Sequence, residues 1–429
     1  MNRIILIGNG FDLAHELETS YRNFIDDLWE DKLMKIQTDL NYVDDDIDIK
    51  GFDHPHNSLL NGMFISYDKI LIHNEKRSIN NGKLTITFKN NFLEKITDHN
   101  YLNNWVDVEN EYFEELLFLI KNDKDNKSRI KKLNEDFLSI KILLEKYISK
   151  EIDKKKNILE KNQEIFDKIY SFFKVEDFSK HGLECFTNDV IIELNRIIDD
   201  SNNSKSTYSN RKHLNLFGYV SQKNDDGKYY LDKEKLHQLI YNQKRENYLF
   251  DFPPLNTLFL NFNYTQTELN YSSNLYYLDE NNVNENHIHG ELNSKTNPII
   301  FGYGDEIGKD YAIIEEANNN DLLENVKSIR YLDTDNYKKL LEYIDSDKYQ
   351  IFIMGHSCGN SDRTLLNSLF EHKNCVSIKV FYHQINNKED NYSDVIRNIS
   401  RNFNDKKIMR EKVVNKKYCS PLVKYNANT

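Results

Sequence analysis

The chain has 429 residues and a formal net charge of −12. This length allows a large α/β core with one or two further folding units, and the negative charge argues against indiscriminate binding of nucleic acid. The four cysteines form no C-x-x-C pair, which excludes a thiolate zinc site or a disulfide framework. No apolar run approaches the ~20 residues of a membrane span. We therefore expect a cytoplasmic protein without a membrane segment.

The first expected element is a buried strand that begins at Arg3 and runs into the turn Gly8-Asn9-Gly10, followed by a helix. Glycines without a Cβ allow positive φ and a close approach of phosphate, and a helix start adds partial positive charge. Only the first part of the G-x-G-x-x-G pattern is present, because Leu13 replaces its last glycine. The turn alone fits nucleotide binding and a plain strand-to-helix connection equally well.

A β-hairpin is expected near residues 63–89, where "MFISYDKILIH" and "KLTITF" flank the turn sequence "NNG". The histidines His54 and His56 precede it in what we expect to be a loop. Together with the first strand and helix, this hairpin makes up the expected first part of the core, residues 1–100.

Residues 101–249 are expected to be a mainly helical insertion that forms a layer or lid beside the core. From Leu133 to Tyr147, apolar residues recur at spacings of three and four, which is typical of a helix packed in a core or against a partner rather than of a cofactor site. The same pattern suggests a self-association surface. A second short hairpin is expected at "GYVSQKNDDGKYYL".

The last part of the chain, residues 250–429, has the pattern of an α/β protein. Its short apolar runs are "TLFLNF", "LYYL", "PIIFGY", "YQIFIMG" and "SIKVFY". With the first strand, these runs predict a mostly parallel, Rossmann-like sheet built from residues 1–100 and 250–429 and interrupted by the helical insertion.

Polar stretches follow several of these runs, and ligands of parallel sheets bind at the carboxyl ends of the strands. The stretches are "NFNYTQTELNY", "HIHGELN", "GYGDE" and "GHSCGNSDRTLLNSL". Each alone is also ordinary for a strand end or helix start; Ser361 or Asp362, for example, is a possible helix cap. Together they predict one pocket surrounded by Gly8, Asn9, Gly10, Asn263, His289 and Ser357.

Five blocks of the sequence resemble the AbiH family of bacterial abortive-infection proteins, which are implicated in resistance to phage. The blocks are "ILIGNGFDLAHELETSYRNF", "NWVDVENEYFEELL", "NFNYT", "HIHGEL" and "IFIMGHSCGNSDRTLL". More distantly, the blocks resemble sirtuin-like NAD hydrolases. That resemblance implies a sirtuin-like fold in which Asn263 and His289 are catalytic. The chain departs from the sirtuin pattern at Asn9, at Phe11-Asp12 and at Thr265, which stands where an aspartate often follows the asparagine block.

Cleavage of the nicotinamide–ribose bond passes through an oxocarbenium-like state, and the expected residues match its needs. Main-chain amides of the glycine turn would bind the diphosphate, Asn263 would orient water or ribose, and His289 would accept a proton. The expected binding residues are Gly8, Asn9, Gly10, Phe11, Asp12, Arg22, Gly355, Ser357 and Asp362. Among these, Ser357 and Asp362 would hold the adenosine side, and Arg22 either pairs with a phosphate or is simply exposed.

Two further groups have alternative interpretations. Glu109 lies on the apolar stripe of its expected helix, so it is either a structural ion-pair partner, which we favour, or an additional acid of the site. His287 and His289 lie on one face of an expected strand, a spacing that allows two metal ligands. Because no third or fourth ligand is evident, we expect no metal.

The leading hypothesis is a phage-defence effector that hydrolyses NAD, its substrate, to nicotinamide and ADP-ribose and needs no separate cofactor. We expect a phage-derived trigger and a homo-oligomer to regulate it. One alternative is a non-catalytic module of the same fold that senses NAD or a related nucleotide. The other is a nuclease or RNA-targeting toxin, which should have a carboxylate–metal cluster or a basic track.

Overall fold

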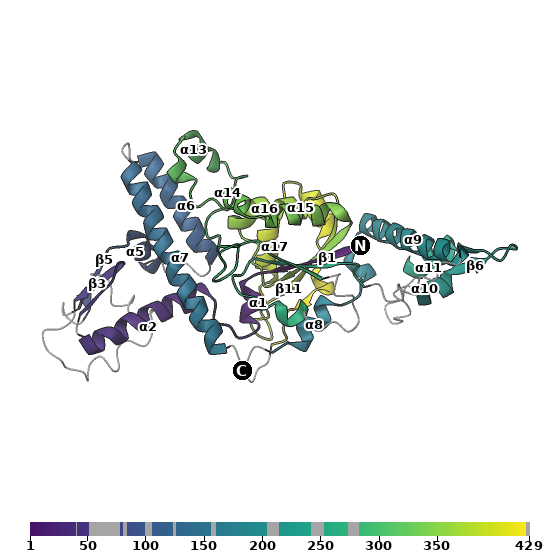
Figure 1. The fold of residues 1–429 in the computed structure, drawn as a ribbon, viewed down its shortest axis with the longest axis horizontal. Helices are drawn as coiled ribbons and strands as arrows, with labels where there is room; N and C mark the ends of the chain where they lie inside the picture. The colour runs from purple at the N-terminus through teal and green to yellow at the C-terminus, as the bar shows by residue number, and fades with distance from the viewer. Residues whose placement is uncertain are drawn as a thin grey trace.

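A computed structural model of the chain describes residues 1–39, 41–50, 78–79, 84–98, 105–122, 126–155, 160–203, 214–241, 253–272 and 283–425. Within these residues, a six-stranded sheet lies at the centre, between two lobes of helices and small antiparallel sheets (Figure 1). Of the helices that the structure describes, none combines the length and apolar character needed to cross a membrane.

The central sheet confirms the prediction that the first strand joins the C-terminal third of the chain. Its strands are β1 (Asn2–Ile7), β8 (Thr257–Asn261), β9 (Val283–His287), β10 (Tyr349–Met354), β11 (Cys375–Tyr382) and β12 (Ser420–Pro421). They stand in the order β12-β11-β10-β1-β8-β9, and each neighbouring pair is parallel. All six carboxyl ends therefore meet at one edge.

Both faces of this sheet are buried, which explains its continuous apolar strands. On one face, Ile4 and Leu6 pack with α15 (Asn336–Ser346), α16 (Arg363–Phe370) and α17 (Tyr392–Arg401). On the other face, Ile5 and Ile7 pack with α1 (Asn9–Leu13), α8 (Gln163–Ile169) and α12 (Leu269–Ser272). Further helices are α13 (Tyr311–Glu316), α14 (Lys327–Arg330) and α18 (Lys406–Lys412).

The strand order of the sheet reverses beside β1. Taken in chain order, the strands progress from β1 through β8 to β9 on one side and from β10 through β11 to β12 on the other. Such a reversal leaves a crevice at the carboxyl ends of the two strands on either side of it, here β1 and β10. The order is compatible with a Rossmann-like arrangement.

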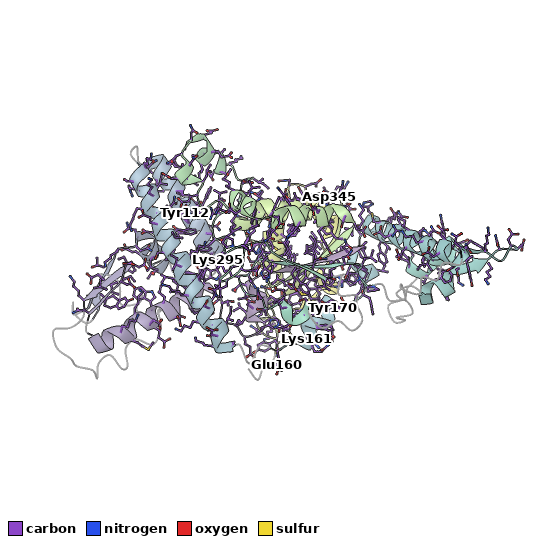
Figure 2. All side chains as sticks on the ribbon, viewed as in Figure 1. Tyr112, Glu160, Lys161, Tyr170, Lys295 and Asp345 are labelled. Atoms are coloured by element: carbon purple, nitrogen blue, oxygen red, sulfur yellow. The ribbon has the colours of Figure 1, made fainter. Side chains whose placement is uncertain are left out.

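The first lobe is formed by the described residues between 21 and 155. Its elements are α2 (Tyr21–Asp39), β2 (Asn41–Val43), β3 (Ile47–Lys50), β4 (Ser78–Ile79), β5 (Leu84–Phe88), α5 (Asn91–Asp98), α6 (Trp105–Asn122) and α7 (Lys127–Lys155). Aromatic side chains hold it together: Tyr112 of α6, labelled in Figure 2, stacks on Phe137 of α7 with ring centroids 4.1 Å apart. Phe137 in turn stacks on Phe301 at 4.8 Å, so this lobe shares a hydrophobic core with the segment after β9.

The expected N-terminal hairpin is described only in part. β4 and β5 pair antiparallel on either side of the "NNG" turn sequence, whereas the expected strand at 63–73, like His54 and His56, lies outside the described residues. β5 also pairs with β3, giving a four-stranded antiparallel sheet in the order β2-β3-β5-β4. This sheet is separate from the central one.

The second lobe contains three helices of the expected insertion: α9 (Lys180–Asn202), α10 (Leu214–Val220) and α11 (Lys233–Tyr241), whereas α8 packs on the central sheet. The predicted hairpin at 218–231 is confirmed, because β6 (Ser221–Lys223) and β7 (Tyr229–Leu231) pair antiparallel. The described helices of 101–249 thus occupy both sides of the central sheet rather than one layer (Figure 1).

Strands were also expected at the apolar runs 298–303 and 275–278. The run at 298–303 is not a strand; its main chain bonds to loops, with Ile300 N donating to His289 O (2.8 Å) and Tyr303 N to Asn325 O (3.0 Å). Its apolar side chains fill the space between the sheet and the first lobe instead. The run at 275–278 lies outside the described residues.

Candidate functional site

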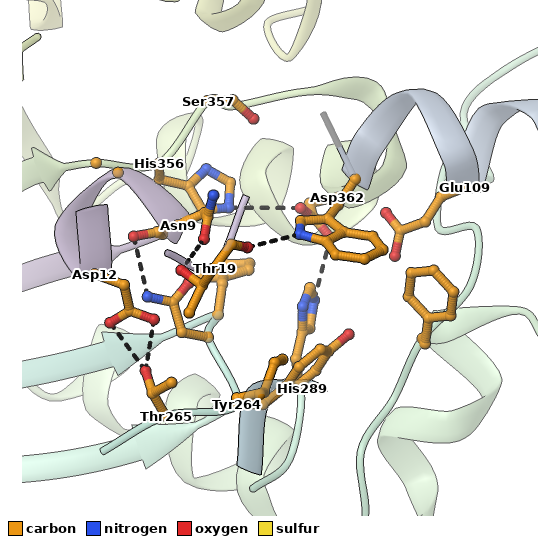
Figure 3. A pocket seen from close by; sticks show the side chains of 18 of the residues that line it. Asn9, Asp12, Thr19, Glu109, Tyr264, Thr265, His289, His356, Ser357 and Asp362 are labelled. Carbon is orange, nitrogen blue, oxygen red and sulfur yellow. Dashed lines mark hydrogen bonds and ion pairs between the residues drawn. The ribbon is translucent and has the colours of Figure 1, made fainter. Parts of the chain in front are cut away.

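A cavity of about 240 Å³ opens at the carboxyl ends of β1, β8, β9 and β10 (Figure 3). Loops after these four strands supply most of its wall, and α6 and α7 of the first lobe close one side. The lining residues are Gly8, Asn9, Gly10, Asp12, Thr19, Trp105, Glu109, Ile148, Phe262, Asn263, Tyr264, Thr265, His289, Phe301, Lys327, Gly355, His356, Ser357 and Asp362.

The structure brings together the six residues expected around one pocket, from Gly8 to Ser357. Asp12, Gly355, Asp362 and Glu109 also line it. Two expected binding residues do not. Phe11 is fully buried in the core beneath the sheet, and Arg22 is exposed on α2, outside the cavity lining. The interpretation of Arg22 as an exposed helix residue is therefore the better one.

The glycines of the turn are required by packing between two loops. A Cβ on Gly8 would lie 2.5 Å from His356 Cα, and a Cβ on Gly10 would lie 2.9 Å from Gly355 Cα. The expected positive φ occurs on the opposite loop, at Gly355 (φ +79°), while Gly8 is extended (φ −135°). Small residues thus let the β1 and β10 loops touch.

The main-chain amides of the turn are partly engaged by the same loop. Gly8 N donates to Met354 O (3.3 Å) and Gly10 N to Gly355 O (2.9 Å). The expectation that all three amides of Gly8-Asn9-Gly10 face a diphosphate is therefore wrong for two of them in this conformation. Asn9 has its side chain at the cavity wall, where its Oδ1 accepts from Thr19 Oγ1 at 2.6 Å.

Asn263 is held between the turn and its own loop. Its side-chain Nδ2 donates to Gly8 O at 3.1 Å, and its main-chain N donates to Asn261 Oδ1 at 2.8 Å. With Nδ2 so engaged, the carboxamide oxygen is left as the acceptor end of the side chain. Asn263 is 9% exposed, so its orientation is set by these contacts and not by solvent.

His289 belongs to a buried chain of charged groups. Its Nε2 lies 3.2 Å from Asp362 Oδ1 and 3.1 Å from the Tyr331 hydroxyl, and Lys327 Nζ lies 2.8 Å from the same Asp362 oxygen (Figure 3 labels His289 and Asp362). Burial would raise the pKa of Asp362, but Lys327 and His289 hold it well below its usual range. Asp362 is therefore an ionised acceptor at neutral pH.

This arrangement fixes the state of the imidazole. Burial, and next the charge of Lys327, lowers the pKa of His289 to about 4, so the ring is neutral at pH 7. Because an ionised carboxylate only accepts, the His289 proton is assigned to Nε2, facing Asp362. Nδ1 then carries the lone pair and is the basic atom of the ring.

His356, which sequence reasoning did not select, faces the other oxygen of Asp362. Its Nδ1 accepts from Cys358 N at 2.9 Å, which places the ring proton on Nε2, 3.5 Å from Asp362 Oδ2. Asp362 is thus surrounded by two imidazoles and Lys327. It does not cap the following helix with its side chain, and it lines the cavity beside His289.

Glu109 forms an ion pair with Lys327, which is the structural role expected for it. Its Oε2 accepts from Lys327 Nζ at 2.9 Å, while its Oε1 accepts from Gly302 N at 3.4 Å. Burial raises the pKa of Glu109, so Asp362 is the stronger acid of the two that face Lys327. Lys327, only 1% exposed, was missed because nothing in the local sequence distinguishes it from a surface lysine.

Asp12 is a structural group at the cavity wall. Its oxygens accept from Thr265 Oγ1 (2.7 and 2.9 Å) and Thr267 Oγ1 (2.8 Å), so it fastens the loop after β8 to α1. A carboxylate therefore does lie beside position 265, although it comes from another element. Burial raises the pKa of Asp12 to about 6 against these hydrogen bonds.

His287 and His289 face different partners. His287 Nε2 lies 2.7 Å from Glu268 Oε1, whereas His289 contacts Asp362. Among the described residues, no group of three or more His, Cys, Asp or Glu side chains is placed to bind a metal ion.

Comparison with known families decides the identity. A family model described as "Bacteriophage abortive infection AbiH" matches residues 4–384, nearly the whole chain. The chain belongs to the AbiH family. Membership indicates a role in abortive infection, a defence of bacteria against phage. No curated protein and no solved structure matches the chain.

The five blocks that resemble AbiH proteins meet at the cavity. Each supplies at least one lining residue, among them Asn9, Glu109, Asn263, His289 and Asp362, one from each block in chain order. Blocks more than 300 residues apart in the chain therefore form one site in this AbiH protein.

Proposed function

We propose that this AbiH protein is a phage-defence effector that hydrolyses NAD to nicotinamide and ADP-ribose through a sirtuin-like site on a Rossmann-like sheet. The proposal rests on one observation above all: Asn263 and His289, the residues that match the catalytic pair of sirtuin-like NAD hydrolases, line one cavity with the turn Gly8-Asn9-Gly10. That cavity lies at the strand-order reversal, where nucleotides bind in parallel sheets.

A second cavity supports a ligand with two halves. It measures about 440 Å³ and shares Gly10, Gly355, His356 and Ser357 with the first cavity. In the proposed complex, the nicotinamide half occupies the first cavity, the adenosine half occupies the second, and the diphosphate crosses the shared loops. Ser357 is exposed and lines this second cavity as well as the first, which supports its proposed role on the adenosine side.

The reaction is a hydrolysis at the ribose carbon that carries nicotinamide. The C–N bond breaks, its electron pair leaves with nicotinamide, and the oxygen of water bonds to the same carbon, releasing one proton. The transition state is oxocarbenium-like, so positioning and acceptor groups near the ribose carry the catalysis. The pyridinium ring leaves as a neutral molecule and needs no acid.

Each proposed catalytic group has a state suited to this reaction. His289 is neutral, with Nε2 directed at Asp362, and its Nδ1 would accept a proton from a ribose hydroxyl or from water. The Asn263 carboxamide oxygen would orient water or ribose, because its Nδ2 is already held by Gly8 O. Asp362 and Lys327 act through His289.

The test is incubation of the purified protein with NAD and, separately, with DNA and RNA. We expect nicotinamide and ADP-ribose from NAD, and no cleaved strands. Asn263→Ala should lower nicotinamide release by roughly 100-fold, whereas Arg22→Ala, altered outside the cavity, should retain it. Binding of NAD without nicotinamide release by the wild type, with or without extract of phage-infected cells, would replace this proposal with the sensor alternative. Strand cleavage would favour the nuclease alternative.

A further inference from the structure

We infer that Glu268 and His287 are positioning residues that set Asn263 in its reactive orientation. The inference rests on the proposed function, because it assigns Asn263 a catalytic role. Neither Glu268 nor His287 lines the cavity, so neither touches a ligand there. Their effect passes through Asn261, the residue that ends β8.

Asn261 connects the buried pair to Asn263. Its Nδ2 donates to Glu268 Oε2 at 2.6 Å and to Thr265 O at 3.0 Å. Its Oδ1 accepts from Asn263 N at 2.8 Å. Because both donors of the carboxamide are directed at Glu268 and Thr265, the oxygen can only face Asn263. A rotation of Asn261 would break this bond and release the loop.

Glu268 keeps Asn261 from rotating, and it needs a partner to do so. Its side chain is 0% exposed, and an ionised carboxylate at such a depth is costly unless it is paired and hydrogen-bonded. The partner is His287 Nε2, 2.7 Å away, at the end of β9. Burial lowers the pKa of His287, but Glu268 outweighs burial and raises it.

Further acidic side chains lie near the pair of Glu268 and His287. Glu285 and Glu291 lie near His287, and Asp12 lies near Glu268. Glu268, Glu285 and Glu291 therefore all favour the protonated form of the His287 imidazole. Loss of His287 would leave Glu268 buried near Asp12 of α1 without this partner.

The chain of contacts from His287 through Glu268 and Asn261 to Asn263 predicts a loss of turnover rather than of NAD binding. If Glu268 and His287 hold Asn263 in place, their removal should displace the Asn263 carboxamide while the glycine turn and the cavity remain. Displacement of a reacting group by about 1 Å lowers turnover by roughly 100-fold, whereas binding through other contacts persists. NAD affinity should therefore change much less than turnover.

The experiment compares Glu268→Ala, Glu268→Gln, His287→Gln and the control Asn286→Ala in nicotinamide release and NAD calorimetry. Asn286 is a buried neighbour of His287 whose Nδ2 donates to Asn336 O (2.8 Å), away from Asn263. We expect Glu268→Ala and His287→Gln to lose about 10- to 100-fold in turnover with little change in affinity. Glu268→Gln, which keeps an acceptor for Asn261, should lose less, and Asn286→Ala should resemble the wild type.

Two further measurements separate positioning from a merely structural role. In an Asn263→Ala background, Glu268→Gln and His287→Gln should cost no further turnover; full additive losses there would overturn the inference. Crystal structures of wild type and Glu268→Ala should show Asn263 Nδ2 moved from Gly8 O in the variant. An unmoved Asn263 would also overturn it. This structural comparison holds even if the wild type releases no nicotinamide, which would count against the proposed function alone.

Discussion

His289 has the chemical state of a base because of residues that lie behind it. Lys327 keeps Asp362 ionised, Asp362 orients Nε2–H, and burial keeps the ring neutral with a pKa of about 4. A histidine protonated at pH 7 would offer only donors and could not accept a proton. Asp362 and Lys327 therefore help to set the protonation state of His289. The sequence alone does not show that these residues lie beside it.

Replacement of His289 should separate binding from chemistry. His289→Ala removes the proton acceptor and leaves the loops of Gly8-Asn9-Gly10 and Gly355 intact. NAD should still bind, and turnover should fall by roughly two to four orders of magnitude, the usual contribution of a general base. Calorimetry gives the first quantity and nicotinamide release the second. Turnover within threefold of wild type, a range of about 0.7 kcal/mol, would remove His289 from the mechanism.

Asp12 should make stability depend on pH. Its folded-state pKa of about 6 lies above the ordinary value of 3.8, so the folded protein binds more protons than the unfolded chain between these values. Stability should therefore fall as pH rises through this window and stay lower above it, by about 3 kcal/mol. Asp12→Asn, which cannot ionise, should lack this decrease. Urea unfolding at pH 4.5 and 7.5 compares the two proteins; parallel changes would contradict the assignment.

At the scale of elements, α6 is fastened to the site by its first two turns. Trp105 Nε1 donates to Thr19 O at 3.0 Å, and Glu109 pairs with Lys327 of α14. Lys327 also contacts Asp362 in the turn that precedes α16. One buried lysine therefore joins the first lobe to the loop that orients His289.

Removal of this lysine should be costly. Lys327→Met leaves Glu109 and Asp362 buried without their cation, which typically costs about 3–5 kcal/mol. Adding Glu109→Gln should recover part of the loss, because one of the two unpaired acids is gone. The exposed pair Asp335–Lys339 (3.0 Å) is the matched control, and Lys339→Met should cost less than about 1 kcal/mol. Urea unfolding compares the free energies of unfolding of these three variants with that of the wild type. Equal costs for Lys327→Met and Lys339→Met would refute the argument.

The elements of the core were predictable where side-chain pattern and burial agree. β1, β8, β10 and β11 are apolar on both faces, so their sequences identify them as buried parallel strands. β9, with the sequence "VNENH", is a polar edge strand held by its pairing with β8. The strand expected to carry both His287 and His289 ends at His287. The apolar run at 298–303 was wrongly predicted to be a strand, because buried apolar residues also occur in irregular segments.

The site was predictable to the extent that its residues follow strands. Asn263, His289 and Ser357 come directly after β8, β9 and β10, and a parallel sheet necessarily brings them to one edge. Lys327 reaches the cavity from the start of the four-residue helix α14, and Phe301 reaches it from an irregular segment, so no periodicity fixes their direction. Their place depends on packing between the first lobe and the sheet, which a single sequence does not reveal.

For the whole molecule, the site lies where the central sheet meets the first lobe, while the second lobe contributes no lining residue among those described. NAD binding should therefore stabilise one side of the molecule selectively. With His289→Ala as a binding-competent variant, hydrogen exchange should slow in residues 105–112 and 355–362 and stay unchanged in α9–α11. Equal protection of both lobes, or none in 105–112, would contradict this arrangement.

Cellular NAD after infection tests the central claim most directly, because it joins the defence role of the family to the proposed chemistry. NAD and nicotinamide should be measured in phage-infected and uninfected bacteria that produce the wild type or His289→Ala at equal levels. We predict that infection depletes NAD and releases nicotinamide in wild-type cells only, and that His289→Ala cells lose both this depletion and their defence. Defence by the wild type with NAD unchanged would contradict the account.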